Sequence, residues 1–287
     1  MTTLISKLLT PEQLAQAYQN ACMAELLAIK PGNVHMFADG HGMTVHDFIK
    51  SAEVSAVAIA QPNLSVGQRI LHAVEATQQA VGMNTNLGLI LLCAPLIHAA
   101  ADESNDATQT LQQSLVEVLR QLTIADAQLA SQAIVLANPA GLGEVAQNSV
   151  YDKPQVTLLE MMCSAQLADR IAWQYSNAFS DVFDFGVTRY LDAMIKWENE
   201  SWATAALYLG FLSRQLDTHI VRKYGNVIAE EVMLEAQDIE SDYWQNDNPK
   251  LVQSRLLAWD VSLKARNINP GTSADLTVAT VLAASLG

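Results

Sequence analysis

The strongest constraint on this chain is an apolar run at residues 87–97 that directly follows the polar triplet Asn84-Thr85-Asn86. A helix that lacks a polar face has to be covered by other helices. We therefore predict a central helix whose residues 89–96 are buried. The triplet caps its first turn, and the remaining backbone N–H groups at the positive end of the helix dipole would attract an anion. A plain helix cap with a tight turn is the alternative interpretation.

Helical signals dominate the rest of the chain. A hydroxyl residue followed three positions later by Glu, Gln or Asp predicts a helix start at Thr10, Thr44, Ser65 and Thr157. The chain has only 13 glycines and 6% aromatic residues, and it shows no sustained strand-like alternation. We predict an all-α fold: a single domain over residues 1–287, built as a multi-helix bundle of roughly ten helices around the buried central helix.

The second half of the chain is divided by polar and glycine-containing breaks between apolar stretches. We predict one long helix from Thr157 to about Asn177, followed by a bend that contains Asp181, Asp184 and Gly186. Later helices are predicted over residues 202–216, 227–237, 249–264 and 273–286.

The charge balance excludes one class of partner. The net charge is −14, with 30 acidic and 16 basic residues, whereas nucleic-acid binding requires a basic face. Cys22, Cys93 and Cys163 are odd in number and lie among apolar neighbours, as is typical of reduced thiols in a cytoplasmic protein. The N-terminal residues lack a signal-peptide pattern, and the apolar run is too short to span a bilayer. We therefore expect a cytoplasmic protein without a membrane partner.

Four polar segments at helix ends carry more functional groups than a turn requires. Taken singly, each is explained by a helix stop, a turn or a cap. Together, their amides and cations suit a polyphosphate, and their carboxylates suit Mg²⁺ that bridges it. None of their spacings matches a zinc site, a P-loop or a dinucleotide fingerprint. The segments are Glu25 with Lys30-Pro31-Gly32-Asn33-Val34-His35, then Asn84-Thr85-Asn86, Asp217-Thr218-His219-Ile220-Val221-Arg222-Lys223-Tyr224-Gly225, and Asn267-Ile268-Asn269-Pro270-Gly271-Thr272-Ser273-Ala274-Asp275-Leu276.

At these places the chain resembles the triphosphoribosyl-dephospho-CoA synthase family, all-helical enzymes that make the precursor of the prosthetic group of citrate and malonate decarboxylases. The resemblance implies a transferase of coenzyme biosynthesis in which ATP loses adenine, a hydroxyl of dephospho-CoA takes over C1 of the ribose, and the triphosphate is retained. The matching pieces are Glu25 with Lys30-Pro31-Gly32, Asn84-Thr85 with Gly88, Gly143-Glu144, Asp217-Thr218 with Arg222 and Gly225, and Pro270-Gly271 with Ser273-Ala274-Asp275-Leu276.

The chain departs from the decarboxylase type of this family at two places. That type carries His-Lys where this chain has Asn86-Leu87, and a second glycine where it has Thr272. The segments around Asn33 and Asp217 are more similar to a branch of methylotrophs and archaea that is associated with one-carbon cofactor metabolism. The expected acceptor is therefore dephospho-CoA or a related cofactor precursor.

The chemistry that the resemblance implies gives roles to these residues. Loss of adenine passes through an oxocarbenium-like state that a carboxylate stabilises, and a carboxylate must also accept the proton of the incoming hydroxyl. The candidates for these roles, which the sequence does not distinguish, are Glu25, Glu144, Asp217 and Asp275. The expected Mg²⁺ would bind at Glu25, Asp217 and Asp275. The candidates for binding the ATP phosphates and ribose are Lys30, Asn33, His35, Asn84, Thr85, Asn86, His219, Arg222, Lys223, Asn269, Gly271 and Ser273.

Other functions stay open at this point. A Mg²⁺-dependent hydrolase of a nucleotide or ADP-ribosyl group would use the same acids with water as the acceptor. A non-catalytic ATP-binding protein would bind ATP without turnover, and a purely helical scaffold would not be stabilised by ATP. The number of metal ions and assembly into a homo-oligomer are also left open.

Overall fold

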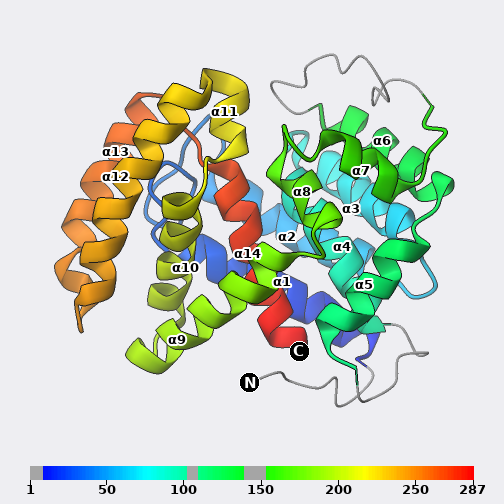
Figure 1. Ribbon diagram of the computed structural model, residues 1–287, viewed down its shortest axis with the longest axis horizontal. Coiled ribbons are helices and arrows are strands. Elements are labelled where there is room, and N and C mark those ends of the chain that lie inside the picture. Colours follow the sequence, from blue (N-terminus) through cyan, green and yellow to red (C-terminus); the bar gives the residue numbers. More distant parts are fainter. Residues whose placement is uncertain (1–8, 102–108, 139–152) are drawn as a thin grey trace.

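The computed structural model describes residues 9–101, 109–138 and 153–287, and these residues form helices and no β-strand (Figure 1). The all-α prediction is confirmed. The predicted number of helices, roughly ten, is too low. The described residues form fourteen α-helices, one π-helix and one 3₁₀-helix. Asp169 divides one predicted helix in two, and the helices η1 (Asp181–Val187) and α11 (Thr218–Tyr224) form in segments whose sequences predict a bend and a polar break.

The first part of the chain builds one side of the molecule, on the right in Figure 1, with α1 running along its border. Six of its helices begin with a reciprocal capping box, at the four predicted positions and also at Thr110 and Thr123. The helices are α1 Pro11–Leu27, α2 Val45–Ile59, α3 Val66–Val81, α4 Leu87–Ala101, α5 Leu111–Gln121, α6 Ile124–Ala137, α7 Leu158–Ala165 and α8 Arg170–Ser176.

The second part of the chain builds the other side, on the left in Figure 1, and then returns to the centre as α14. Helix α14 packs against α1, α4, α10 and the π-helix η1, so it joins the two sides. The elements are η1 Asp181–Val187, α9 Thr188–Trp197, α10 Glu200–Arg214, α11 Thr218–Tyr224, α12 Asn226–Gln245, the 3₁₀-helix η2 Pro249–Leu251, α13 Gln253–Ala265 and α14 Gly271–Leu286.

Helix α4 is buried along its length, as its sequence predicts. Every residue from 89 to 96 is buried, and α4 packs against α3, α5 and α14. Pro95 lies inside this helix and has no N–H to donate to the carbonyl of Leu91. The hydroxyl of Tyr175 donates to that carbonyl at 2.6 Å. The hydrogen bond from α8 therefore allows a proline in the core.

Three predicted boundaries are wrong. The helix predicted from Thr157 to Asn177 is two helices, because Asp169 caps a new one with hydrogen bonds to the backbone N–H groups of Ile171 and Ala172. The predicted bend at residues 181–186 is the π-helix η1, which runs directly into α9. Gly186 permits the close packing of η1 against α14, since a Cβ atom at this position would lie 2.6 Å from Oγ1 of Thr280. Helix α12 extends to Gln245, well beyond residue 237.

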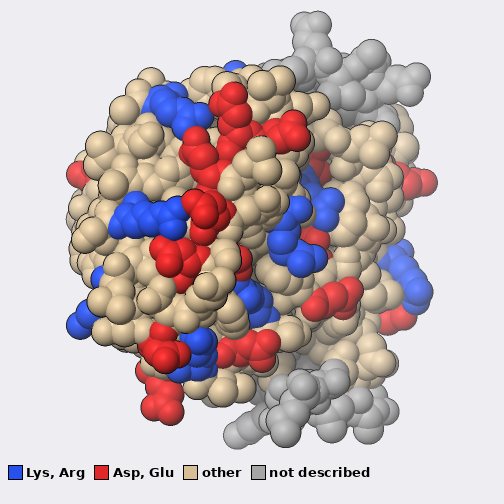
Figure 2. Space-filling view, turned by 60° about the vertical axis from the view of Figure 1, so that its left-hand side comes forward, with Lys and Arg blue, Asp and Glu red and all other residues tan. Residues whose placement is uncertain are grey.

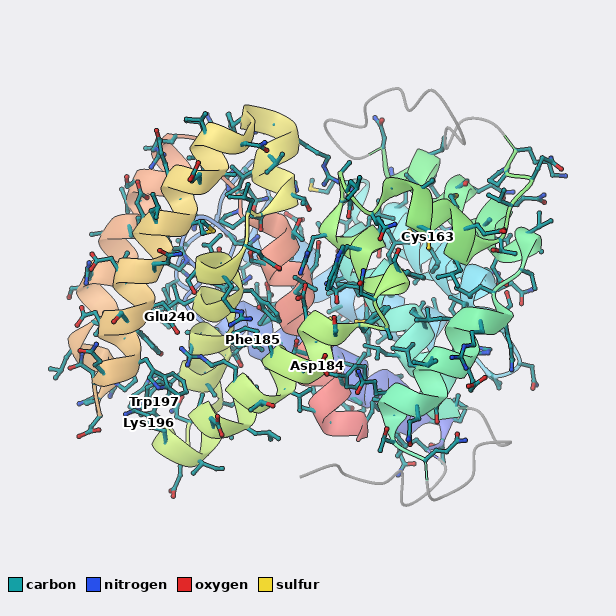
Figure 3. All side chains as sticks on the ribbon, viewed as in Figure 1. Cys163, Asp184, Phe185, Lys196, Trp197 and Glu240 are labelled. Atoms are coloured by element: carbon teal, nitrogen blue, oxygen red, sulfur yellow. The ribbon has the colours of Figure 1, made fainter. Side chains whose placement is uncertain are left out.

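The outer helices carry interspersed charges. Figure 2 shows acidic and basic side chains side by side on the face that brings the left side of Figure 1 forward. Arg255 of α13 pairs with Asp242 of α12 at 2.9 Å, and Arg266 pairs with Glu235 at 3.1 Å. At the end of α9, Trp197 packs edge-on against Trp244 of α12 at 5.1 Å between ring centroids (Figure 3). No described helix is long and apolar enough to cross a bilayer.

Candidate active site

A cavity of about 770 Å³ lies between the two sides of the molecule. Its walls come from α1, the loop after α1, α2, the start of α4, α6, the α7–α8 loop, α11 and the start of α14. Eleven of the residues predicted to form the site line this cavity: Glu25, Asn33, Asn84, Thr85, Asn86, His219, Arg222, Lys223, Asn269, Gly271 and Asp275.

A buried lysine lies directly behind one wall. Lys30 is fully buried and forms an ion pair with Glu25. Its Nζ atom also donates to Asn33 Oδ1 at 2.8 Å, and the Asn33 amide donates to Asn269 at 2.8 Å. Burial raises the pKa of Glu25 and lowers the pKa of Lys30, and the attraction between the two groups opposes both shifts. Lys30 thus acts on the cavity through Glu25 and Asn33, which line it.

The loop after α1 is held from behind by α13. Gly32 has a φ of 84°, and its N–H donates to Asp260 at 2.8 Å. His35, which is fully buried, has Nε2 3.4 Å from the Asp260 carboxylate, and Lys264 pairs with the same group at 3.0 Å. Burial lowers the pKa of His35. His35 therefore lies behind the cavity wall, and Asp260, which the sequence pattern does not indicate, fixes the loop.

The polar triplet before α4 lines the cavity, but each of its side chains also has a partner in the fold. Asn84 Oδ1 accepts from the Leu87 N–H at 3.1 Å, which caps α4. The hydroxyls of Thr85 and Ser51 lie 2.5 Å apart. The buried amide of Asn86 donates to Thr77 at 3.0 Å. These contacts fix the opening of α4 to the cavity.

Asp217 joins the starts of two helices. Its Oδ1 atom caps α11 by accepting from the N–H groups of His219 and Ile220 at 2.9 and 3.2 Å. Its Oδ2 atom accepts from both the N–H and the hydroxyl of Ser273, each at 2.8 Å. Asp217 and Ser273 are buried and lie behind the residues that line the cavity. Both carboxylate oxygens are therefore committed to holding α11 against α14.

The cationic wall is formed by α11. Arg222 and Lys223 both line the cavity, together with His219, and burial lowers the pKa of His219. The guanidinium of Arg222 contacts the carboxylate of Asp169, at the end of the α7–α8 loop. Asp169 also lines the cavity. The sequence reasoning missed it, although an aspartate before a helical stretch is a capping signal.

The carboxylate of Asp275 lines the cavity and is the best candidate for a reactive group. Asp275 lies near the start of α14, and its carboxylate forms no hydrogen bond with any residue in the described ranges. Burial raises its pKa well above the usual value, and the nearby charges of Asp217, Glu25 and Asp169 raise it further, while Arg222 opposes them. A Cβ atom at Gly88 would collide with this carboxylate. Glycine at position 88 is thus what lets Asp275 approach the start of α4.

One predicted site residue, Glu144, lies outside the described residues. For Mg²⁺, the described residues include no cluster of three or more His, Cys, Asp or Glu side chains arranged for a metal ion. Of the proposed ligands, Glu25 is committed to Lys30 and Asp217 to four donors, which leaves Asp275. One carboxylate fits the binding of Mg²⁺ together with substrate phosphates and water.

The fold and the cavity define an all-helical protein whose site is lined by both carboxylates and cations. The sequence profile of the family described as ATP:dephospho-CoA triphosphoribosyl transferase matches residues 11–287. The chain belongs to that family and is an ATP-dependent triphosphoribosyl transferase.

A solved structure shares the fold. A crystal structure from Archaeoglobus fulgidus, of a protein provisionally assigned as a triphosphoribosyl-dephospho-CoA synthase, matches with a TM-score of 0.64 at 21% sequence identity. The match covers 82% of this chain and 96% of that chain. A search of curated protein sequences gave no match.

Proposed function

We propose that the cavity binds ATP and transfers its triphosphoribosyl group to a hydroxyl of dephospho-CoA or a related cofactor precursor, with release of adenine. The observation that carries this proposal is the Asp275 carboxylate, which faces the cavity without a hydrogen-bond partner among the described residues while Arg222 and Lys223 line the same space. A reactive acid beside a cationic wall suits attack on a ribose that carries a triphosphate.

The cations and amides have the binding role in this proposal. Arg222 and Lys223 contact the phosphate oxygens, and Asn33, Asn269 and the triplet before α4 add neutral hydrogen-bonding groups. Mg²⁺ bound to the triphosphate would neutralise part of its charge, and Asp275 would be the protein carboxylate that holds it together with phosphate oxygens and water. Of the 16 Lys and Arg residues of the chain, Arg222 and Lys223 are the ones that line the cavity among the described residues, so each should matter to binding.

The acids have the chemical role. The bond between ribose C1 and the adenine nitrogen breaks, and the electron pair leaves with adenine. The negative charge of Glu25 stabilises the oxocarbenium-like state. A bond forms between C1 and the acceptor oxygen, and Asp275 takes the proton of the acceptor hydroxyl.

Mass spectrometry of the products tests this function. Purified protein is incubated with ATP and dephospho-CoA, with and without Mg²⁺, and with a panel of other cofactor precursors that carry hydroxyls. We expect adenine and one triphosphoribosyl adduct, formed with Mg²⁺ and strongly reduced in Asp275→Asn. Free ribose triphosphate would instead indicate a hydrolase, and ATP binding without any product would indicate a non-catalytic protein.

A further inference from the structure

The ion pair between Asp169 and Arg222 connects the two sides of the cavity. Arg222 belongs to α11, and Asp169 ends the loop between α7 and α8. Figure 1 shows α8 and α11 on different sides of the molecule. Both residues line the cavity, and both are only partly exposed, at 31% for the arginine side chain and 24% for the aspartate. Asp169 therefore occupies Arg222, the cation to which the proposed triphosphate would bind.

Asp169 is fixed in place and cannot simply follow Arg222. Its Oδ1 atom accepts from the N–H groups of Ile171 and Ala172 at 2.8 and 3.3 Å, which caps α8, and only Oδ2 contacts Arg222. The next residue, Arg170, donates its backbone N–H to the Thr218 hydroxyl at 3.2 Å. If the pair separates, the long side chain of Arg222 has to move, since movement of Asp169 would uncap α8.

The charges of the cavity leave few free cations. Lys30 is bonded to Glu25, and Arg222 is bonded to Asp169. Among the described residues that line the cavity, Lys223 is therefore the cation without a carboxylate partner; its Nζ atom lies 5.2 Å from the centre of the Tyr224 ring. A triphosphate carries several negative charges and gains most from a guanidinium that can bind two oxygens. The triphosphate therefore has to displace Asp169 from Arg222.

We propose that Asp169 is an internal competitor for Arg222 that keeps weakly charged anions from occupying the site. This inference rests on the proposed placement of the triphosphate at Arg222. A monophosphate that displaces Asp169 loses one ion pair and gains one. A polyphosphate contacts Lys223 as well, so it gains more than it loses. Asp169 thus lowers the affinity for both ligands by the same factor, and only the polyphosphate has a further contact that offsets this loss.

The test uses Asp169→Asn, because asparagine retains the cap of α8 and removes the competing charge. Inorganic tripolyphosphate and inorganic phosphate are titrated calorimetrically into the full-length protein without Mg²⁺. We expect the variant to bind both ligands more tightly by a similar factor, about fivefold, because each ligand has to displace the same partner of Arg222. The matched control is Asp181→Asn. Asp181 pairs at 2.7 Å with Arg170, which does not line the cavity, and we expect less than about a twofold change.

A double-mutant cycle separates this inference from the proposed function. In an Arg222→Ala background, Asp169→Asn should have almost no effect, because the contested cation is absent. The inference is wrong if Asp169→Asn weakens or does not change binding, or if its gain persists in that background as a general effect of charge. If Arg222→Ala alone leaves tripolyphosphate binding unchanged, the proposed placement of the triphosphate fails, and this inference fails with it.

Discussion

The carboxylate of Asp275 lies against the backbone of Gly88, so closely that a Cβ atom at position 88 would lie 2.7 Å from its Cγ atom. Gly88 is the second residue of α4 and Asp275 is the fifth residue of α14. The two most buried helices of the fold thus meet at the acid that we propose as the proton acceptor.

Gly88→Ala should therefore displace Asp275. We expect transferase activity to fall by more than about tenfold while the free energy of unfolding falls by about 1–3 kcal/mol, the usual cost of overpacking. The measurements are adenine release and urea unfolding. The control is Gly82→Ala, at a left-handed helix cap with a φ of 73° and no atom within 4 Å of the new Cβ. It should cost about 1–2 kcal/mol and retain activity. Full activity in Gly88→Ala would show that the position of Asp275 is unimportant.

Arg222 and Lys223 should differ in their effect on ATP binding, although they are adjacent. Their side chains diverge by about 100° around the helix axis, and only the guanidinium can bind two phosphate oxygens at once. We expect Arg222→Ala to weaken ATP binding by about 2–5 kcal/mol and Lys223→Ala by much less. Calorimetric titration with ATP measures both. Equal and small losses would mean that the pair is an ordinary solvated face.

Asp217 should act mainly on stability. Its four hydrogen bonds join the starts of α11 and α14. Asp217→Asn turns one acceptor into a donor that faces the Ser273 N–H, so we expect a loss of about 2–4 kcal/mol in the free energy of unfolding. Ser273→Ala removes one hydroxyl donor and should cost about 1 kcal/mol. A variant Asp217→Asn with unchanged stability and no turnover would instead support the catalytic role that the sequence suggests.

Asp126 should make stability depend on acidic pH. Burial opposes its ionisation, but hydrogen bonds from Ser65, Thr123 and the Gly67 N–H outweigh this and hold its pKa below the usual value. A lowered pKa in the folded state stabilises the protein above the unfolded-state pKa, about 3.9, and this contribution is lost as the pH falls through the folded-state pKa.

We therefore expect Asp126→Asn to be less stable than the wild type near neutral pH and to approach it below about pH 4. Urea unfolding at a series of pH values measures this difference. Glu117→Gln, in an exposed pair with Arg120, is the control and should show little change. A constant difference between Asp126→Asn and the wild type at all pH values would contradict the explanation.

The three cysteines should differ in reactivity. Burial raises the pKa of Cys22 and of Cys93, so both thiols stay protonated and unreactive. Cys163 lies on α7 and is partly exposed (Figure 3). We expect a thiol reagent to label Cys163 alone in the native protein and all three residues after unfolding, as peptide mass spectrometry can measure. Rapid native labelling of Cys93 would contradict the packing around α4.

Local chemistry explains which parts of the fold could be predicted. The capping boxes at Thr10, Thr44, Ser65 and Thr157 and the buried α4 follow from neighbouring residues alone. The break between α7 and α8 does not, because Asp169 caps α8 in a stretch that otherwise favours a helix. The ion pair between Asp169 and Arg222 joins residues that are 53 positions apart in the sequence.

The same distinction applies to the candidate site. The polar segments at helix ends indicated Glu25, Arg222 and Asp275, which line the cavity. No neighbouring residue distinguishes Asp275, which lines the cavity, from Asp217, which is committed to Ser273. Asp260 was missed, since its hydrogen bond to Gly32 spans 228 residues. Such partners are set by the tertiary fold, and a pattern of neighbouring residues does not reveal them.

The packing of α14 against α1 and α4 also has a consequence for synthesis of the protein. Helix α14 follows the other described helices in the chain, so the apolar surfaces that it covers on α1 and α4 stay uncovered until it has been synthesised. Asp275 lies on this helix. A nascent chain that lacks α14 therefore carries Arg222 and the segment before α4 but not Asp275, and the docking of α14 both covers the core and completes the proposed site.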